Sequence, residues 1–355
     1  MRRPRSTATT LAAATVLVTA TALVTATIAA VATVAGCALP TSQASDKTGP
    51  VTIRYQGSAN TVSLPELAQD LGYYPSIRLK WVGNTISGPQ DIQSAATGQT
   101  DVGGAFAGAV VKLIQAGAPV QAVVNYYGED AKSYIGFFVR DSSPIHSARD
   151  LIGKKVAVNA LGAHSEAVID TYLQKNSLTP AEIRQVQLVV LPPNDTEQAL
   201  RRGQVDVASL GGVLQDHAVA AGGLRSLFSD YQLFGAFDGG QYVLRKDFIA
   251  AHPAAARKFV TGVAKAIEWE RSTPREQVIA RFADIITRRG RNESTDNLKY
   301  WKSVAIPSHG GQITDADFTR RQPWLEATGV VGKGQLKPTT LYSNELNALA
   351  TGGGS

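Results

Sequence analysis

The stretch DIQSAATGQTDVGG at 91–104 recurs as TEQALRRGQVDVAS at 196–209, and this recurrence decides the fold. Both copies carry a glutamine, a Gly-Gln pair and an Asp-Val pair at equivalent positions; in the first copy these begin at Gln93, Gly98 and Asp101. Each copy has the pattern of a helix that ends at a glycine, followed by an aspartate and a strand. The constant spacing of 105 residues therefore indicates a repeated unit of structure.

A second pair of stretches lies at the same spacing. VTIRYQGS at 51–58 aligns without a gap with VAVNALGA at 156–163. Each stretch alternates apolar and polar residues, as a strand does, and then reaches a glycine turn. Strands that alternate with helices favour a parallel sheet with right-handed crossovers. We therefore expect two similar α/β lobes, each with the order strand, helix, strand, helix, strand.

The predicted elements follow this order in both copies. In the first copy they are strands 52–55, 78–82 and 102–105 and helices 64–71 and 89–97. In the second they are strands 155–158, 186–191 and 205–210 and helices 164–175 and 195–202. Beyond them we expect a strand at 120–124. Two further strands are expected to leave and re-enter the first lobe, at 134–140 and 241–245. Helices are expected at 247–249, 254–271, 275–289, 297–303 and 315–328. Residues 264, 266, 267 and 269 have the spacing of one buried helical stripe.

The domain boundaries follow from the two connecting strands. The first lobe is discontinuous, with a first part at 50–139 and a second, helical part at 241–348. The second lobe occupies 140–240, and 349–355 is a flexible tail. The fold class is thus α/β, with a mostly parallel sheet flanked by helices in each lobe and a ligand cleft between the lobes.

The pattern of the N-terminal 49 residues predicts an export and anchoring segment. Arg2, Arg3 and Arg5 precede a long uncharged stretch of small and apolar residues, which predicts a signal peptide at 1–36. It ends in VAGC, similar to a bacterial lipoprotein box, so we expect a lipid on Cys37 and a tether at 37–49. The alternative is an uncleaved anchor helix, because the stretch approaches membrane-spanning length. The mature chain is then held by lipid on the outer face of the cytoplasmic membrane.

Composition excludes several classes of protein. The 355 residues favour two domains over one. A single cysteine cannot form a disulfide within the chain or a cysteine zinc site. Removing the three N-terminal arginines lowers the formal net charge from +6 to +3, too small an excess to indicate a nucleic-acid partner.

Candidate ligand contacts lie in the turns after the strands, because open parallel sheets bind ligands beyond the carboxyl ends of their strands. Two lobes with two crossings place those ends on either side of a hinged cleft. The expected ligand-binding residues are Gln56, Gly57, Ser58, Asn60, Asn84, Thr85, Ala105, Phe106, Asn125, Tyr126, Gly162, Ala163, His164, Asn194, Asp195, Ser209, Gly211 and Gly212. Each has an alternative, purely structural role; Gly57 and Gly162, for example, also suit tight turns.

The chemistry of these turns favours an organic anion. Several of them lead into helix N-termini, where unpaired backbone N–H groups and the helix dipole bind negative charge. The turns contain no lysine or arginine, so neutral donors would hold the anion. Catalytic patterns are sparse: the histidines lie far apart, and His164 with Glu166 fits helix capping and ligand contact better than acid–base work. We therefore expect no catalytic residues, metal or cofactor.

The chain resembles the substrate-binding lipoproteins of ABC importers, in the aliphatic sulfonate, taurine and nitrate group that also includes receptors for thiamine pyrimidine precursors. The matching stretches are 53–57, 88–103, 115–119, 141–159 and 199–206, within a resemblance that covers about 50–275. The resemblance implies a periplasmic-binding-protein fold of the second type, a monomer that does no catalysis, and delivery of a sulfonate-like ligand to a membrane permease powered by an ATPase.

One departure from that group concerns 209–212, Ser-Leu-Gly-Gly, where the sulfonate members often carry an aromatic residue and a proline. This wall of the pocket is smaller here, which favours a bulkier or more apolar ligand over a plain sulfonate. Other interpretations stay open: a receptor for a pyrimidine-type solute, a ligand-sensing module without transport, and an enzyme on the same fold, for which His164 is the residue to test.

Overall fold

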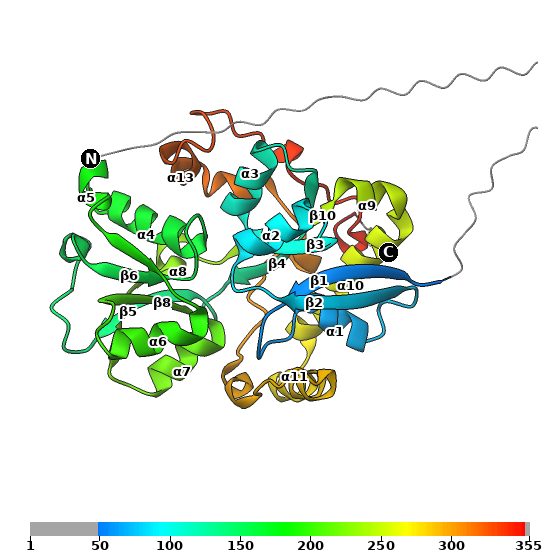
Figure 1. Cartoon of the computed structure of the whole chain (residues 1–355), viewed down its shortest axis with the longest axis horizontal. Helices are drawn as coiled ribbons and strands as arrows, with labels where there is room; N and C mark the ends of the chain where they lie inside the picture. The colour runs from blue at the N-terminus through cyan, green and yellow to red at the C-terminus, as the bar shows by residue number, and fades with distance from the viewer. Residues whose placement is uncertain (1–48, 352–355) are drawn as a thin grey trace, which may run out of the picture. The chain divides into compact units, whose positions relative to one another are not determined.

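Residues 49–351 are described by the computed structural model (Figure 1). The predicted signal peptide and Cys37 lie outside the described residues, as does nearly all of the tether. Among the described residues, no helix combines the length and the apolar character needed to span a membrane.

Lobe one, residues 49–129 and 237–351, contains five strands. They are β1 (Val51–Gly57), β2 (Ile77–Asn84), β3 (Val102–Phe106), β4 (Val120–Glu129) and β10 (Phe237–Arg245). β1 pairs with β2 in parallel, and β10 lies antiparallel between β3 and β4. The backbone N–H of Asp101 donates to the carbonyl oxygen of Arg54 over 2.9 Å, which places β3 beside β1.

Lobe two, residues 135–234, contains one five-stranded sheet with the order β7-β6-β8-β5-β9. Its strands are β5 (Ile135–Arg140), β6 (Lys155–Val158), β7 (Gln187–Val190), β8 (Val207–Gly211) and β9 (Leu224–Ser229). β6 is parallel to β7 and β8, and β5 is antiparallel to β8 and β9. Each lobe thus has the same plan, in which an antiparallel strand enters beside the third parallel strand.

The repeated aspartates have the same contact in both lobes. Asp101 Oδ2 accepts from the backbone N–H of Arg54 over 2.8 Å, and Asp206 Oδ2 accepts from that of Lys155 over 2.9 Å. Arg54 is therefore equivalent to Lys155, whereas the constant spacing of 105 residues pairs it with Asn159, so the predicted register of the first block is wrong. Shifting a strand by an even number of residues preserves its alternation, so the pattern alone does not fix the register.

Helices flank both sheets. Lobe one has α1 (Leu64–Asp70), α2 (Gly88–Ala96), α3 (Ala107–Gln115), α9 (Lys246–Ala251), α10 (Pro253–Ser272), α11 (Arg275–Arg289), α12 (Asp315–Thr319), α13 (Gln322–Ala327) and α14 (Ala348–Thr351). Lobe two has α4 (His164–Lys175), α5 (Pro180–Ile183), α6 (Pro193–Arg201), α7 (Gly212–Ala220) and α8 (Asp230–Phe234). Figure 1 shows α4 on one side of the lobe-two sheet and α6 and α7 on the other.

The C-terminal helices differ from the predicted ones in three places. Only a 3-10 turn, Asp296–Tyr300, forms where a helix at 297–303 is predicted. The predicted helix 315–328 is split into α12 and α13, because Pro323 lies in the first turn of α13, where its missing N–H is tolerated. The tail predicted from 349 onward begins with the last three residues of α14.

The two crossings between the lobes also lie earlier than predicted. β5 pairs with β8 and β9, so the first crossing is at 130–134 instead of 139/140. β10 already pairs with β4 at Phe237, so the second crossing is at 235–236 instead of 240/241. Both connecting strands are mostly buried, and only their pairing partners decide to which lobe they belong.

The core of lobe one forms between the sheet and α10. Phe259, Val263 and Ile267 of α10 are fully buried with Ile53 of β1 and Leu244 of β10. The predicted stripe is confirmed, with Trp269 at its half-buried end. This packing fixes the strand ends that face lobe two.

Candidate ligand-binding cleft

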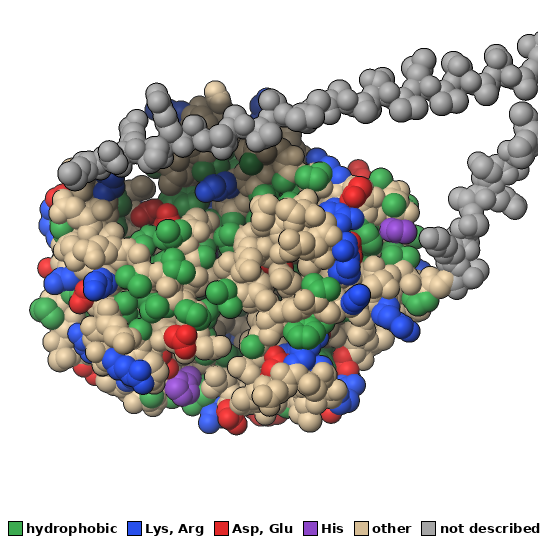
Figure 2. All heavy atoms as spheres, in the orientation of Figure 1, with side chains coloured by type: hydrophobic (Ala, Val, Ile, Leu, Met, Phe, Trp, Pro, Cys, Tyr) green, Lys and Arg blue, Asp and Glu red, His purple; other side chains and the backbone are tan. Residues whose placement is uncertain are grey.

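A cleft of about 750 Å³ in two adjoining compartments lies between the strand ends of the two lobes. The outer compartment, of about 500 Å³, is lined mainly by lobe one, from 56–64, 84–88 and 297–304. The inner compartment, of about 250 Å³, is lined mainly by lobe two, including the first residues of α4 and α6 and the end of β8. Figure 2 shows hydrophobic side chains gathered over the strands of lobe two on the visible face of the molecule.

Most of the predicted ligand contacts line these compartments. Gln56, Gly57, Ser58, Asn60, Asn84, Thr85 and Asn194 line the outer compartment. Phe106, Ala163, His164, Ser209 and Gly211 line the inner compartment, and Tyr126 lines both. The structure thus brings together turns that are more than 100 residues apart in the sequence.

Five predicted contacts do not line the cleft: Ala105, Asn125, Gly162, Asp195 and Gly212. Asn125 is fully buried, and its amide donates to the carbonyl of Gln312 over 2.9 Å and accepts from Gln241 over 2.8 Å. Ala105 is fully buried in β3 beneath Gly88, the residue that lines the cleft in its place. The end of a strand therefore does not by itself bring a side chain into the cleft.

Asn60 lines the outer compartment, but its polar groups are used within the protein. Its φ is 62°, its N–H donates to Glu293 over 2.9 Å, and its side-chain oxygen accepts from the N–H of Ser294 over 2.8 Å. Asn84 is similar, because its oxygen accepts from the Trp81 indole over 3.2 Å. Both residues shape the outer compartment.

Several lining residues have no counterpart in the sequence analysis. Trp301 and Leu298 come from a segment far from any strand end, and Glu270 comes from the last turn of α10. Their position depends on how the C-terminal helices fold back, for which the sequence carries no local signal. Asn159 lines both compartments directly after β6. With Arg54 matched to Lys155, Asn159 becomes the equivalent of Ser58, so the correct register would have found it.

The outer compartment has two acidic residues and, among its lining residues, no lysine or arginine. Asp91 Oδ2 accepts from the N–H of Gly104 over 2.7 Å, whereas Oδ1 is buried without a hydrogen-bond partner. Burial raises the pKa of Asp91 to about 7 and that of Glu270 to about 8. Near neutral pH Glu270 is therefore mostly protonated and Asp91 partly so, and this wall can exchange hydrogen bonds with a ligand.

The inner compartment is the better environment for negative charge. Ala163, His164 and Ser165, at the start of the 12-residue helix α4, line it together with Pro193 at the start of α6. The first turn of a helix has N–H groups without intrahelical partners and carries the positive end of the helix dipole. The start of α4 therefore offers N–H groups to this small space, whereas Pro192 and Pro193 at the start of α6 have none.

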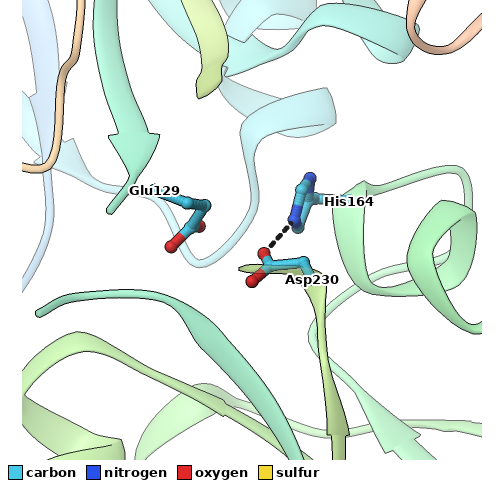
Figure 3. Close-up of side chains that lie close together, drawn as sticks. All are labelled: Glu129, His164 and Asp230. Carbon is cyan, nitrogen blue, oxygen red and sulfur yellow. Dashed lines mark hydrogen bonds and ion pairs between the residues drawn. The ribbon is translucent and has the colours of Figure 1, made fainter. Parts of the chain in front are cut away.

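Behind this compartment lies a buried polar cluster of Glu129, His164, Asp230 and Arg321 (Figure 3 shows the first three). His164 Nε2 lies 2.8 Å from Asp230 Oδ2, and Arg321 Nη2 lies 3.4 Å from His164 Nδ1. The Glu129 carboxyl lies beside that of Asp230, with an oxygen of each within 4.8 Å of the other. Burial and the neighbouring Asp230 raise the pKa of Glu129 well above its usual range, and burial lowers that of His164.

One imidazole and two carboxylates, with ligand atoms within 4.8 Å of one another, have the donor set of a zinc site. The surroundings do not fit one. A metal on Nε2 would leave Nδ1 protonated against the Arg321 guanidinium, where ligating histidines usually face a carboxylate or carbonyl. Neutral His164 instead accepts from Arg321 and donates to Asp230, so we interpret the cluster as a hydrogen-bonded network.

Two lobes with the same strand plan, two crossings and a cleft between strand ends define the two-lobed periplasmic-binding-protein fold of the second type. The chain belongs to the family described as NMT1/THI5 like, which matches residues 66–277. No curated protein matches the chain.

Solved structures share this fold across most of the chain. The periplasmic aliphatic sulphonate binding protein SsuA from Escherichia coli has 21% identity and a TM-score of 0.61, over 83% of this chain and 92% of its own. The periplasmic nitrate-binding protein NrtA from Synechocystis PCC 6803 has 13% identity and a TM-score of 0.63, over 84% and 87%. The desulfurization enzyme DSZB has 14% identity and a TM-score of 0.56, over 83% and 97%, so the fold also serves an enzyme.

Proposed function

We propose that the chain is the solute-binding component of an ABC importer, held by a lipid on Cys37 at the outer face of the cytoplasmic membrane. It captures a small organic anion between its lobes and delivers it to a permease powered by an ATPase. The observation that carries this proposal is the cleft lined from both lobes, because a hinge between them can enclose a solute. Membership of the NMT1/THI5-like family and the fold shared with SsuA support it.

The charges in the cleft suggest how the ligand is oriented. A sulfonate-like head group fits the inner compartment, at the start of α4, where Ser165 adds a buried hydroxyl without an internal hydrogen bond. The body of the ligand then extends into the outer compartment along Tyr126 and Trp301. A second negative charge there would find no lysine or arginine among the lining residues, so we expect a monoanion.

A thermal-shift panel on residues 38–355 tests the proposal. The ligands are alkanesulfonates, taurine, nitrate, aromatic sulfonates and pyrimidine precursors. A ligand at about a hundred times its Kd adds roughly 2.7 kcal/mol to the folded state. An anion that stabilises the parent should stabilise Ser165→Ala less, while Ser226→Ala, an exposed serine on β9, should match the parent. Equal shifts in all three proteins would reject the inner compartment as the anion site.

A pyrimidine-type solute is the second candidate. Tyr126 and Tyr242 line the outer compartment with ring centroids 4.2 Å apart, and planar heterocycles pack well against such faces. Asp91 and Glu270 would exchange hydrogen bonds with ring nitrogens and amino groups. In the same panel, stabilisation by a pyrimidine but by no sulfonate, lost in Asp91→Leu, would favour this candidate.

The lipid anchor has a separate test. We expect the full-length chain, produced in a bacterium that processes lipoproteins, to fractionate with membranes, and Cys37→Ser to release it. Mass spectrometry of the N-terminal peptide would show an acylated Cys37. Membrane retention of Cys37→Ser would favour the uncleaved anchor helix.

A further inference from the structure

The cluster of Glu129, His164 and Asp230 connects the two crossings to the cleft. Glu129 is the last residue of β4, immediately before the first crossing, and Asp230 is the first residue of α8, the helix before the second. His164 begins α4 and lines the inner compartment. The contacts of this cluster therefore join lobe one to lobe two where the lobes pivot.

The carboxyl groups of Glu129 and Asp230 are both buried and have oxygens within 4.8 Å of each other, so they cannot both carry a charge at low cost and one of them holds a proton. Within residues 49–351, neither carboxyl forms an ion pair with lysine or arginine, and Asp230 is hydrogen-bonded to neutral His164. Asp230 Oδ1 also accepts from the N–H of Ile135, in lobe two, over 3.0 Å. A proton shared by the two carboxyls would thus tie Glu129 to lobe two.

The other ionisable groups around the cluster either contact aromatic rings or carry a charge that acts on Glu129. Arg321 is buried, with its guanidinium 4.6 Å from the Phe234 ring centroid, and Arg320 lies over Phe237. Asp130 follows Glu129 along the chain and opposes a negative charge on it, and a charged Glu129 in turn raises the pKa of nearby Tyr127. Losing the shared proton therefore places an additional negative charge where only Arg321 offsets it.

We propose that Glu129, Asp230 and His164 form a proton-dependent latch, which favours the lobe arrangement of this structure while the two carboxyls share a proton and weakens when it is lost. The latch regulates the cleft assigned under the proposed function, since His164 belongs to both. An anion at the start of α4 would favour a positive His164, so solute binding and the latch proton are coupled.

The direction of the pH effect follows from proton binding. The latched arrangement holds a proton on Glu129 that an opened, hydrated Glu129 loses at its ordinary pKa. As pH rises from that value to the raised pKa, the ratio of latched to opened molecules falls by up to tenfold per pH unit for one proton. The pKa of His164 is lowered in the latched arrangement, so below the ordinary histidine pKa a rise in pH favours the latched molecules. Above about pH 6.5 this effect ends and the Glu129 effect dominates.

The test measures the distance between the lobes without ligand. Residues 38–355 lack the only cysteine, so Lys80→Cys on β2 and Gln187→Cys on β7 give one fluorophore in each lobe. We expect energy transfer to fall as pH rises above about 6.5. Glu129→Gln, which keeps a donor towards Asp230 without a titrating proton, should flatten this dependence. Asp284→Asn, a 60% exposed acid on α11, is the matched control and should keep it.

Each other outcome overturns the inference. A wild-type signal independent of pH, or the same dependence in Glu129→Gln and Asp284→Asn, excludes the latch. Closure restored at alkaline pH by Zn²⁺ and reversed by chelator would make the cluster a metal site. If Glu129→Gln does not fold, Asp230→Asn supplies the same comparison. The measurement needs no solute, so a thermal-shift panel without a hit would reject the proposed ligand class and leave the latch standing.

Discussion

At the residue scale, the buried acids of lobe one cost stability that a ligand or a neutral side chain could restore. Glu270 is only 7% exposed in α10, and its pKa rises through burial from 4.5 to about 8. An acid whose folded pKa is raised destabilises the fold progressively as pH increases from the ordinary to the raised value. The protein tolerates this cost at the wall of its cleft, where function and stability often conflict.

Glu270→Gln should therefore stabilise the ligand-free protein at alkaline pH. The gain should be small near pH 5 and reach about 1 to 4 kcal/mol near pH 9, because glutamine removes the charge and keeps the shape. Urea unfolding at both pH values measures it. Glu276→Gln, an 81% exposed neighbour on α11, should change neither curve. A gain that does not depend on pH would show that the charge of Glu270 is not the cause.

The prediction that residues directly after strands line the cleft identified much of it, and the reason is geometric. Ser58, Thr85 and His164 line it because parallel strands that run side by side end at one edge. Glu270 and Trp301 could not be predicted, because helix residues reach the cleft only through tertiary packing. Asn125 was predicted wrongly, because its side chain completes a buried network with Gln241 and Asp317.

At the scale of elements, hydrophobic pattern and capping fixed the helix bounds wherever both were present. The predicted 155–158, 164–175 and 275–289 coincide with β6, α4 and α11. α11 illustrates why: it begins directly after Pro274 and ends at Gly290, whose φ of 63° suits a glycine cap. The segment 297–303 has neither signal and forms only a 3-10 turn, because Leu298 is the one fully apolar residue that it buries.

The two copies of the strand aspartate offer a matched experiment on one motif. Asp101 accepts from the backbone and from Nε and Nη2 of Arg54, whereas Asp206 accepts only from the Lys155 backbone. Asp101→Ala should therefore cost about 2–3 kcal/mol and Asp206→Ala about 1 kcal/mol. Denaturant unfolding of both variants checks the order. An equal or reversed order would show that the arginine bonds add nothing.

At the scale of the whole molecule, a second contact joins the lobes on the far side of the outer compartment. Lys302 Nζ lies 2.5 Å from Asp216 Oδ1 of α7, and Tyr300 packs edge-on against His217 with ring centroids 5.7 Å apart. These residues follow α11, so the segment that lines the outer compartment also reaches lobe two. It therefore opposes opening of the cleft.

Lys302→Ala should favour separation of the lobes, but only slightly. The Lys302 side chain is 47% exposed, and exposed ion pairs contribute about 0.2–1 kcal/mol. We expect a shift of about two- to fivefold in the lobe equilibrium, seen as lower energy transfer between the same two labels. High salt should reduce the difference from wild type. A difference that persists in high salt would point to packing around Tyr300 instead.

Lobe membership was the part of the architecture that the sequence predicted least well. β5 and β10 are both buried strands next to a crossing, and either lobe could have buried them. The pairing of β5 with β8 and of β10 with β3 decides to which lobe each strand belongs, and the sequence holds no local signal for either pairing.

The position of β10 has a consequence for the order in which the chain can assemble. All five strands of lobe two lie within 135–229, so this lobe can fold before the residues after it are available. β3 and β4 pair only with β10 in the three-stranded sheet, so their edges stay open until residue 245 has emerged, and open edges invite aggregation. Pulsed hydrogen exchange during refolding should therefore protect β6 and β8 before β3 and β4, and simultaneous protection would contradict this order.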